Sequence, residues 1–107
     1  MKSIKENRLF RKAYNKGCKC ICGEFVLYCL KNNLNENFLG VTVSKKLGKA
    51  NIRNKVRRRI KEIIRLNEEN IKKGYFIVVV ARTRAVYLEY SHLEKNLLSL
   101  LKEAKLL

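Results

Sequence analysis

The sequence predicts an α+β fold, a single-domain α–β sandwich in which helices pack on a sheet of three or four strands. Three observations predict it. The chain has 107 residues, of which 47% are apolar, enough for one hydrophobic core but not for two. Helical and strand-like apolar patterns follow one another in the order helix, strand, strand, helix, strand, helix (α-β-β-α-β-α). No repeat or linker separates them, so we expect residues 1–107 to form one domain.

Residues 1–17 are predicted to form a basic lead-in followed by a helix. Ser3 and Glu6 fit a capping box at its start, with Asn7 as an alternative cap. Gly17 is expected to end the helix, since glycine tolerates the left-handed conformation. One face of this helix is apolar, which by itself favours core packing. Its members are Leu9, Phe10, Ala13 and Tyr14.

Residues 20–31 and 38–44 are predicted to be two strands, because both are rich in strand-forming residues. Between Phe25 and Leu30 both faces of the first strand are apolar, so we expect it to be covered on both sides. A polar stretch with four asparagines, residues 31–37, separates the two strands and is typical of a turn. So short a connection predicts an antiparallel hairpin.

The next segment is strongly basic. Residues 45–61 hold nine basic side chains and no acid, and they are predicted to start a helix from about Ala50 to Leu66. One stripe of this helix is apolar and should pack on the core, while an adjoining face is polar and basic. The apolar positions are Ile52, Val56, Ile60, Ile63 and Ile64. The polar positions are Arg53, Asn54, Arg57, Arg58, Lys61 and Arg65.

Gly74 introduces a run of seven apolar residues, 75–81, which predicts a strand buried on both faces. The last element is predicted to be a helix from about Ser91, where Ser91 and Glu94 fit a capping box. His92 lies in its first turn and is expected to be a solvated surface residue. The apolar stripe of this helix is Leu93, Leu97, Leu100, Leu101 and Ala104.

The composition points to a polyanionic partner and away from protein-based catalysis. The chain carries 25 Lys and Arg residues against nine acids, for a net charge of +16, and a compact state repels itself at that charge. All the acids are Glu, and they are not clustered in sequence as carboxylate ligands of nuclease metal ions are. His92 has no second histidine for metal-free cleavage of RNA. We therefore expect a nucleic acid as partner, with no catalytic residue and no metal ligand in the protein.

No apolar run is long enough to cross a bilayer, and the first residues do not resemble a signal peptide. We therefore expect a cytoplasmic protein without a membrane partner or an obligate protein partner. Cys18, Cys20 and Cys22 alternate and Cys29 follows, which leaves three interpretations: plain thiols, a metal site or another function. Because zinc sites use two spaced pairs of ligands and disulfides are rare in a reducing cytosol, plain thiols are favoured.

The basic helix itself indicates phosphate binding. A solvated helix would mix charges of both signs, and a membrane-surface helix would carry bulky aromatics opposite its charges, whereas this one carries Ile and Val there. Arginine in the centre of the run favours bidentate contacts to phosphate. Tyr28 on the first strand, with Phe10 and Tyr14 beside it, would give a single strand rings on which to stack its bases. Whether the partner is RNA or DNA stays open at this point.

The segment KKLGKANIRNKVRRRIKE resembles the protein subunit of bacterial ribonuclease P. Phe25-Val26-Leu27-Tyr28 and the run from Gly40 to Lys46 are similar to other signatures of that family, although Lys49 and Asn51 stand where it more often has Asn and Val. The positions that match its basic motif are Lys45, Lys46, Gly48, Ala50, Arg53, Asn54, Arg57, Arg58, Lys61 and Glu62.

The resemblance implies a left-handed β-α-β crossover at the basic helix, against the general right-handed rule. It also implies that the domain binds the catalytic RNA of ribonuclease P and helps it to remove the 5′ leader from precursor tRNA. In that family Mg²⁺ is held mainly by the RNA, which carries out the hydrolysis, and the protein binds no cofactor tightly. The alternatives are a non-catalytic ribosome-associated or general RNA chaperone and a DNA-binding architectural protein.

By position, the resemblance assigns seven residues to the catalytic RNA and three aromatic residues to a cleft for the leader. The expected place of these aromatic residues thereby changes from the core to the cleft. Lys16 or Lys31 would contact the leader backbone. The residues assigned to the catalytic RNA are Lys45, Lys46, Arg53, Asn54, Arg57, Arg58 and Lys61. Those assigned to the leader cleft are Phe10, Tyr14 and Tyr28.

Overall fold

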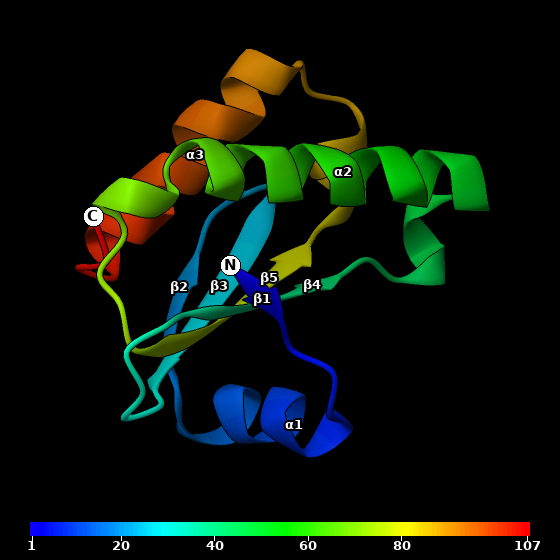
Figure 1. Cartoon of the computed structure of the whole chain (residues 1–107). Coiled ribbons are helices and arrows are strands. Elements are labelled where there is room, and N and C mark those ends of the chain that lie inside the picture. Colours follow the sequence, from blue (N-terminus) through cyan, green and yellow to red (C-terminus); the bar gives the residue numbers. More distant parts are fainter.

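The computed structural model describes residues 1–107, and in it a five-stranded sheet separates one helix from two others (Figure 1). The strand order across the sheet is β1-β4-β5-β3-β2. The strands are β1 (Lys2–Ser3), β2 (Cys18–Ile21), β3 (Phe25–Lys31), β4 (Phe38–Thr42) and β5 (Tyr75–Ala81). The helices are α1 (Asn7–Lys16), α2 (Ala50–Leu66) and α3 (Tyr90–Glu103), with short 3₁₀ helices η1 (Lys45–Leu47), η2 (Glu68–Asn70) and η3 (Thr83–Val86).

The predicted hairpin between residues 20–31 and 38–44 is wrong. β5 lies between β3 and β4, antiparallel to the first and parallel to the second. The asparagines of the connection bind the chain that leads into β5 instead of closing a tight turn. The Asn32 backbone N–H donates to the Gly74 carbonyl (2.9 Å), and the Asn37 side chain accepts from the Tyr75 N–H (2.9 Å). β5 is apolar on both faces. Placing it between β3 and β4 therefore buries more apolar surface than the predicted direct pairing of β3 with β4 would.

β4, α2 and β5 form a crossover, because β4 and β5 are adjacent and parallel and α2 lies between them in sequence. The boundaries predicted for α2 are confirmed, since the helix runs from Ala50 to Leu66. Parallel neighbours need such a long connection, which a helix supplies. The strongly basic segment is therefore the connection between two strands of the sheet.

Two edge strands add to the three that the sequence predicts. The predicted strand 20–31 is a hairpin of β2 and β3, in which Ile21 pairs with Val26 across a turn at Gly23. At the other edge β1 pairs with β4, with Ser3 opposite Leu39. Strands of two and four residues give too short a pattern to detect by alternation.

The predicted helix caps are wrong. α1 begins after Glu6 and α3 after Glu89, and neither start has a side-chain cap hydrogen bond. Ser3 is not free to cap α1, because it belongs to β1. Gly17 does end α1, but with φ −78° and ψ 161° its backbone is extended and not left-handed. Glycine is needed there for space, since a Cβ at position 17 would lie 2.6 Å from the Ala13 carbonyl oxygen.

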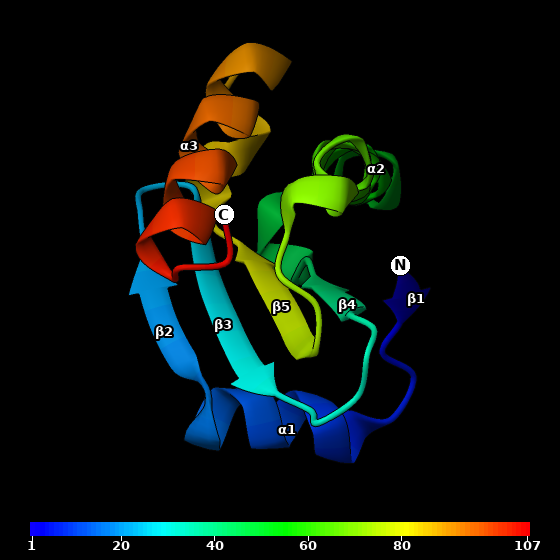
Figure 2. The ribbon, with the colours of Figure 1, turned by 60° about the vertical axis from the view of Figure 1, so that its left-hand side comes forward.

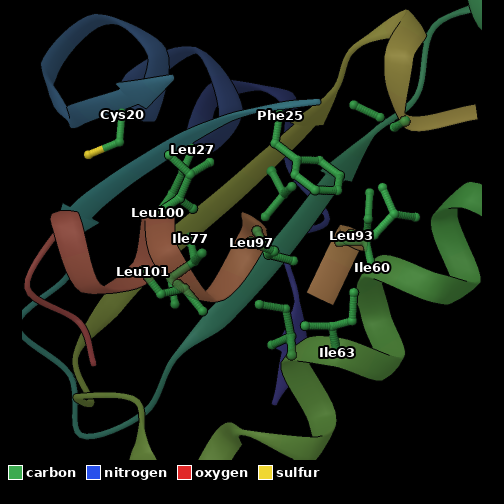
Figure 3. Packing of buried hydrophobic residues seen from close by; sticks show 14 of the residues in the cluster. Cys20, Phe25, Leu27, Ile60, Ile63, Ile77, Leu93, Leu97, Leu100 and Leu101 are labelled. Carbon is green, nitrogen blue, oxygen red and sulfur yellow. The ribbon is translucent and has the colours of Figure 1, made fainter. Parts of the chain in front are cut away.

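The main core lies between the sheet and the helices α2 and α3, and it contains 20 buried residues. Figure 3 shows Ile60 and Ile63 of α2 and Leu93 and Leu97 of α3 pointing toward Phe25 of β3. The apolar stripes predicted for α2 and α3 are largely confirmed, because all their members are buried except Ile52 and Ala104, which are half-buried, whereas in the stripe of α1 only Ala13 is buried. The predicted exposure of His92 is also confirmed.

The opposite face of the sheet carries α1 and a much smaller core (Figure 2). Only three hydrophobic residues are buried there, Ile4, Ala13 and Val78, and half-buried rings surround them. β3 and β5 are covered on both faces as predicted, since their odd-numbered residues face the main core while Tyr28, Val78 and Val80 face α1. None of the helices has the length and apolar character needed to span a membrane.

Candidate nucleic-acid interface

The basic segment 45–61 contains no acid, and six of its nine cations are exposed, while Arg53, Arg57 and Arg59 are half-buried. Five ion pairs occur in the structure, and none of them involves a residue between 37 and 61. Two further exposed lysines, Lys49 and Lys55, add to the charge of this segment. We call its exposed cations the basic surface. They are Lys45, Lys46, Lys49, Lys55, Arg58 and Lys61.

Hydrogen bonds within the segment hold two of its arginines in place. Arg53 Nε donates to the Gly48 carbonyl (3.1 Å), and Arg57 donates to the Asn54 side-chain oxygen (2.8 Å). Gly48 has φ +133°, a conformation that favours glycine, so the turn between η1 and α2 depends on it. These bonds leave N–H donors of each guanidinium unused while restricting its rotamers, which lowers the entropy lost when a phosphate binds.

Arg59 and Arg65 are basic residues of α2 with other partners. Arg59 donates to the carbonyl of Leu88, beyond η3, at 3.3 Å. Arg65 makes two hydrogen bonds to Glu62, at 2.6 Å and 3.0 Å. This contact lowers the pKa of the Glu62 carboxyl, through the hydrogen bonds first and the charge of Arg65 second. Arg65 is therefore already neutralised, whereas Arg58, seven residues earlier on the helix, has no acidic partner.

The three aromatic residues predicted to form a cleft lie together on the opposite face. The rings of Tyr14 and Tyr28 meet edge to face with centroids 4.9 Å apart, and Phe10 follows 6.4 Å from Tyr14. The Tyr14 and Thr42 hydroxyl groups are 3.0 Å apart and hydrogen-bonded, which ties α1 to the end of β4. Tyr14 keeps 36% of its surface exposed, and Phe10 and Tyr28 are half-buried. We call Phe10, Tyr14 and Tyr28 the aromatic groove.

A missing side chain lets α1 approach the sheet at this groove. Phe10 lies over Gly40 of β4, where an added Cβ would lie 2.6 Å from the Cζ atom of the ring. A glycine inside a strand often marks such a close approach, so the sequence contained a signal for it. The open side of the groove is lined by Asn7 and Arg11 as well as by Phe10, Tyr14 and Thr42.

Sequence reasoning missed two neighbours of the groove. Lys19 of β2 pairs with Tyr28 across the ladder and holds its ammonium group 5.8 Å from the centre of the Tyr28 ring. Arg11 is the cation that lines the groove itself. Helical spacing places Arg11 beside Phe10 and Tyr14, but Lys19 could be found only by knowing that β2 exists. Lys16 and Lys31 are exposed at the ends of α1 and β3.

The basic surface and the aromatic groove lie on different sides of the sheet, because the sheet lies between α1 and α2 (Figures 1 and 2). They approach each other at the end of β4. Thr42 borders the groove, and the chain reaches Lys45 only three residues later. A nucleic acid that occupied both surfaces would have to pass around this edge.

A profile of the ribonuclease P family matches residues 1–105. The chain belongs to the ribonuclease P protein family. It is 48% identical to the ribonuclease P protein component of Clostridium botulinum over 102 residues, which are 94% of this chain and 92% of the relative.

Two solved ribonuclease P proteins have the same fold. The Staphylococcus aureus protein superimposes with a TM-score of 0.92 and 34% identity, and the match covers 99% of this chain and 97% of that one. The Thermotoga maritima protein gives a TM-score of 0.88 and 32% identity over 96% of this chain and 97% of that one. Membership makes this chain a protein component of ribonuclease P, a ribonucleoprotein endoribonuclease of tRNA processing, and makes ribonuclease P RNA its partner.

Proposed function

We propose that the chain binds ribonuclease P RNA through its basic surface together with Arg53, Asn54 and Arg57, and that it binds the single-stranded 5′ leader of precursor tRNA in the aromatic groove. The RNA subunit, with bound Mg²⁺, carries out the hydrolysis. The observation that carries this proposal is the separation of two surfaces of different chemistry by one sheet. Two surfaces suit two nucleic-acid ligands held at the same time.

The basic surface suits folded RNA, which presents phosphates in a fixed array. Residues of α2 four apart, such as Asn54 and Arg58 or Arg57 and Lys61, follow one another along the helix at a spacing of about 6 Å. Repulsion between like charges at this spacing weakens the free helix slightly, and phosphates would relieve it. Binding should therefore release counterions and depend strongly on salt.

The aromatic groove suits an unpaired strand. A base can stack on an exposed ring whatever its sequence, and base–aromatic stacking contributes about 1–3 kcal/mol for each base. Tyr14 offers exposed ring surface, while Arg11 and Lys19 lie where backbone phosphates would pass. A duplex could not place its bases on these rings, so the groove favours a leader over the paired acceptor stem.

Assignment of Mg²⁺ to the RNA is supported by the placement of the acids. No three residues of the types His, Cys, Asp and Glu come together in an arrangement that could hold a metal ion. Of the nine glutamates, Glu62 is committed to Arg65 and Glu24 is buried at the tip of the β2–β3 hairpin. In this proposal the protein orients RNA, and the ions act within the RNA.

The proposal is tested by cleavage of precursor tRNA by the cognate catalytic RNA at low Mg²⁺, with and without the protein. The protein should stimulate leader removal, and mature tRNA should compete less well than the precursor. Absence of stimulation would overturn the proposal. Equal competition by precursor, mature tRNA and unrelated structured RNA would indicate a general RNA chaperone, and tighter binding of duplex DNA at matched salt would indicate an architectural DNA-binding protein.

A further inference from the structure

The β2–β3 ladder places two cysteines directly opposite each other. Cys18 pairs with Cys29 in the antiparallel register, and both are free thiols. Directly opposed residues of an antiparallel pair have Cα atoms about 4.5–5.5 Å apart, and their side chains point to the same face. Because disulfides span Cα separations of about 4.4–6.8 Å, a bond between these two cysteines needs little movement of the backbone.

The two thiols differ in their surroundings. Cys18 is exposed, whereas Cys29 is 5% exposed and belongs to the main core. Burial above all, and then the nearby thiols of Cys18 and Cys20, raise the pKa of Cys29 to about 11. A reagent in solution therefore meets Cys18 first, and Cys29 then reacts with whatever forms on Cys18.

The other two cysteines have no thiol opposite them. Cys20 is buried and pairs with Leu27, and Cys22 donates a hydrogen bond to Glu24 at 3.6 Å. The titratable groups near the pair are Cys20 on the same strand and Glu103 of α3, which acts on Cys20. On the side of β5, Cys29 faces the uncharged Ile77.

We propose that Cys18 and Cys29 form a dithiol site that a low-molecular-weight disulfide oxidises to an intramolecular disulfide. The Cys18 thiolate attacks one sulfur of the reagent, forms a mixed disulfide and releases one reagent thiolate. The Cys29 thiolate then attacks Sγ of Cys18, forms the Cys18–Cys29 bond and releases the second reagent thiolate. Each cysteine proton passes to solvent, and the two electrons given up by the cysteines reduce the reagent to two thiols.

The bond would fasten the edge strand β2 to β3 beside the aromatic groove. Cys18 follows Gly17, where α1 ends, and its neighbour Lys19 lies over the ring of Tyr28 on the other face of the ladder. Sequence alone favoured plain thiols, from the absence of zinc-ligand spacing and the rarity of cytosolic disulfides, and it does not reveal that Cys29 lies opposite Cys18. The proposal does not depend on RNA binding and is tested on the free protein.

The experiment treats the folded, full-length protein with dithiobis(nitrobenzoate), whose released thiolate is coloured. We expect a fast release from Cys18 followed by a slower one, and the slower rate should rise about tenfold per pH unit below the pKa of Cys29, as its thiolate fraction does. Digestion with trypsin and a Glu-specific protease then separates residues 17–19, 20–24 and 25–31, so that Cys18 and Cys29 fall in different fragments. Fragments 17–19 and 25–31 should be recovered joined.

Two variants complete the test. Cys18→Ser changes an exposed side chain, so the protein should fold, and it should lose the fast release and the joined fragments. Cys22→Ser is the matched control and should keep both. A stable mixed disulfide on Cys18 without joined fragments would overturn the proposal. So would joining of fragment 20–24 to either neighbour in place of the 17–19 to 25–31 pair.

Discussion

The two faces of the sheet differ in the size of the hydrophobic core that each one covers. The face under α2 and α3 shares a core of 20 buried residues, whereas the face under α1 has three. The same strands serve both, because alternate residues of β3 and β5 point to opposite sides. Stability therefore comes mainly from one face, and the other can leave rings partly open to solvent.

The two faces also differ in the chemistry that they present. On one face, α2 packs on the main core and carries exposed cations. On the other face, the aromatic groove lies over the smaller core. A substitution on one face should consequently affect one property and leave the other unchanged. The following predictions test that separation, from the largest expected effect to the smallest.

The largest effect should follow truncation in the main core. Ile60→Ala should lower the free energy of unfolding by about 2–5 kcal/mol, because Ile60 is fully buried and its loss leaves a cavity. Tyr14→Ala on the other face removes a side chain that is 36% exposed and should cost clearly less. Urea unfolding followed by circular dichroism measures both. Equal losses would contradict the assignment of stability to one face.

The next effect concerns Glu24, a buried acid at the tip of the β2–β3 hairpin. Its carboxylate accepts a hydrogen bond from the Asn96 side chain of α3 at 2.7 Å, and Arg84 lies 3.8 Å away. Glu24→Ala leaves the Asn96 amide without this partner and should cost about 1–3 kcal/mol of unfolding free energy. Glu69→Ala, at an exposed acid without an ion pair, is the control and should change the urea midpoint little.

A third prediction separates leader binding from stability. Tyr28→Ala should reduce the preference for precursor over mature tRNA by about 1–3 kcal/mol if a base stacks on the ring. Tyr87→Ala, at a ring that is 80% exposed and distant from the groove in sequence and fold, should leave the preference intact. Affinities of the assembled holoenzyme for the two RNAs provide the measurement. An equal loss for both would place Tyr28 outside the leader site.

The smallest effect is expected for single cations of α2. Arg58→Ala should weaken assembly with the catalytic RNA and lower the slope of log affinity against log salt by about 0.7–0.9, the share of one phosphate contact. Arg65→Ala is the matched control on the same helix, because Glu62 already neutralises Arg65, and its slope should change less. Combined with Tyr28→Ala, Arg58→Ala should act additively, since the sheet separates the two sites. Coupling between them would show that one ligand spans both faces.

Sequence reasoning succeeded where a pattern is local. The seventeen residues of α2 have a complete apolar stripe, and the continuous apolar run of β5 has no other interpretation in a small domain. It failed where partners are distant in sequence. Nothing in residues 31–37 reveals that Asn32 and Asn37 bind the chain before β5, so the connection resembled a hairpin turn. The predicted cap of α1 failed because Ser3 belongs to β1, and that of α3 failed because the helix begins at Tyr90, so that Ser91 lies within it.

For the candidate site, the residue types were predictable and their arrangement was not. The aromatic residues do meet, as their positions on α1 and β3 suggested. Their separation from the basic helix depends on which face α1 covers, and that is decided by long-range packing against Val78 and Gly40. Lys19 and Thr42 became visible only once the strand register was known.

The contact of Phe10 with Gly40 gives a means of redesigning the protein. Because Gly40 has no side chain, the Phe10 ring rests directly on the backbone of β4, and this contact sets the distance between α1 and the sheet. Alanine there would force the ring outward, and with it the helix that forms one wall of the groove. The width of the groove can thus be altered by substituting a sheet residue that is proposed to contact neither the catalytic RNA nor the precursor tRNA. The main core on the other face of the sheet is left unchanged.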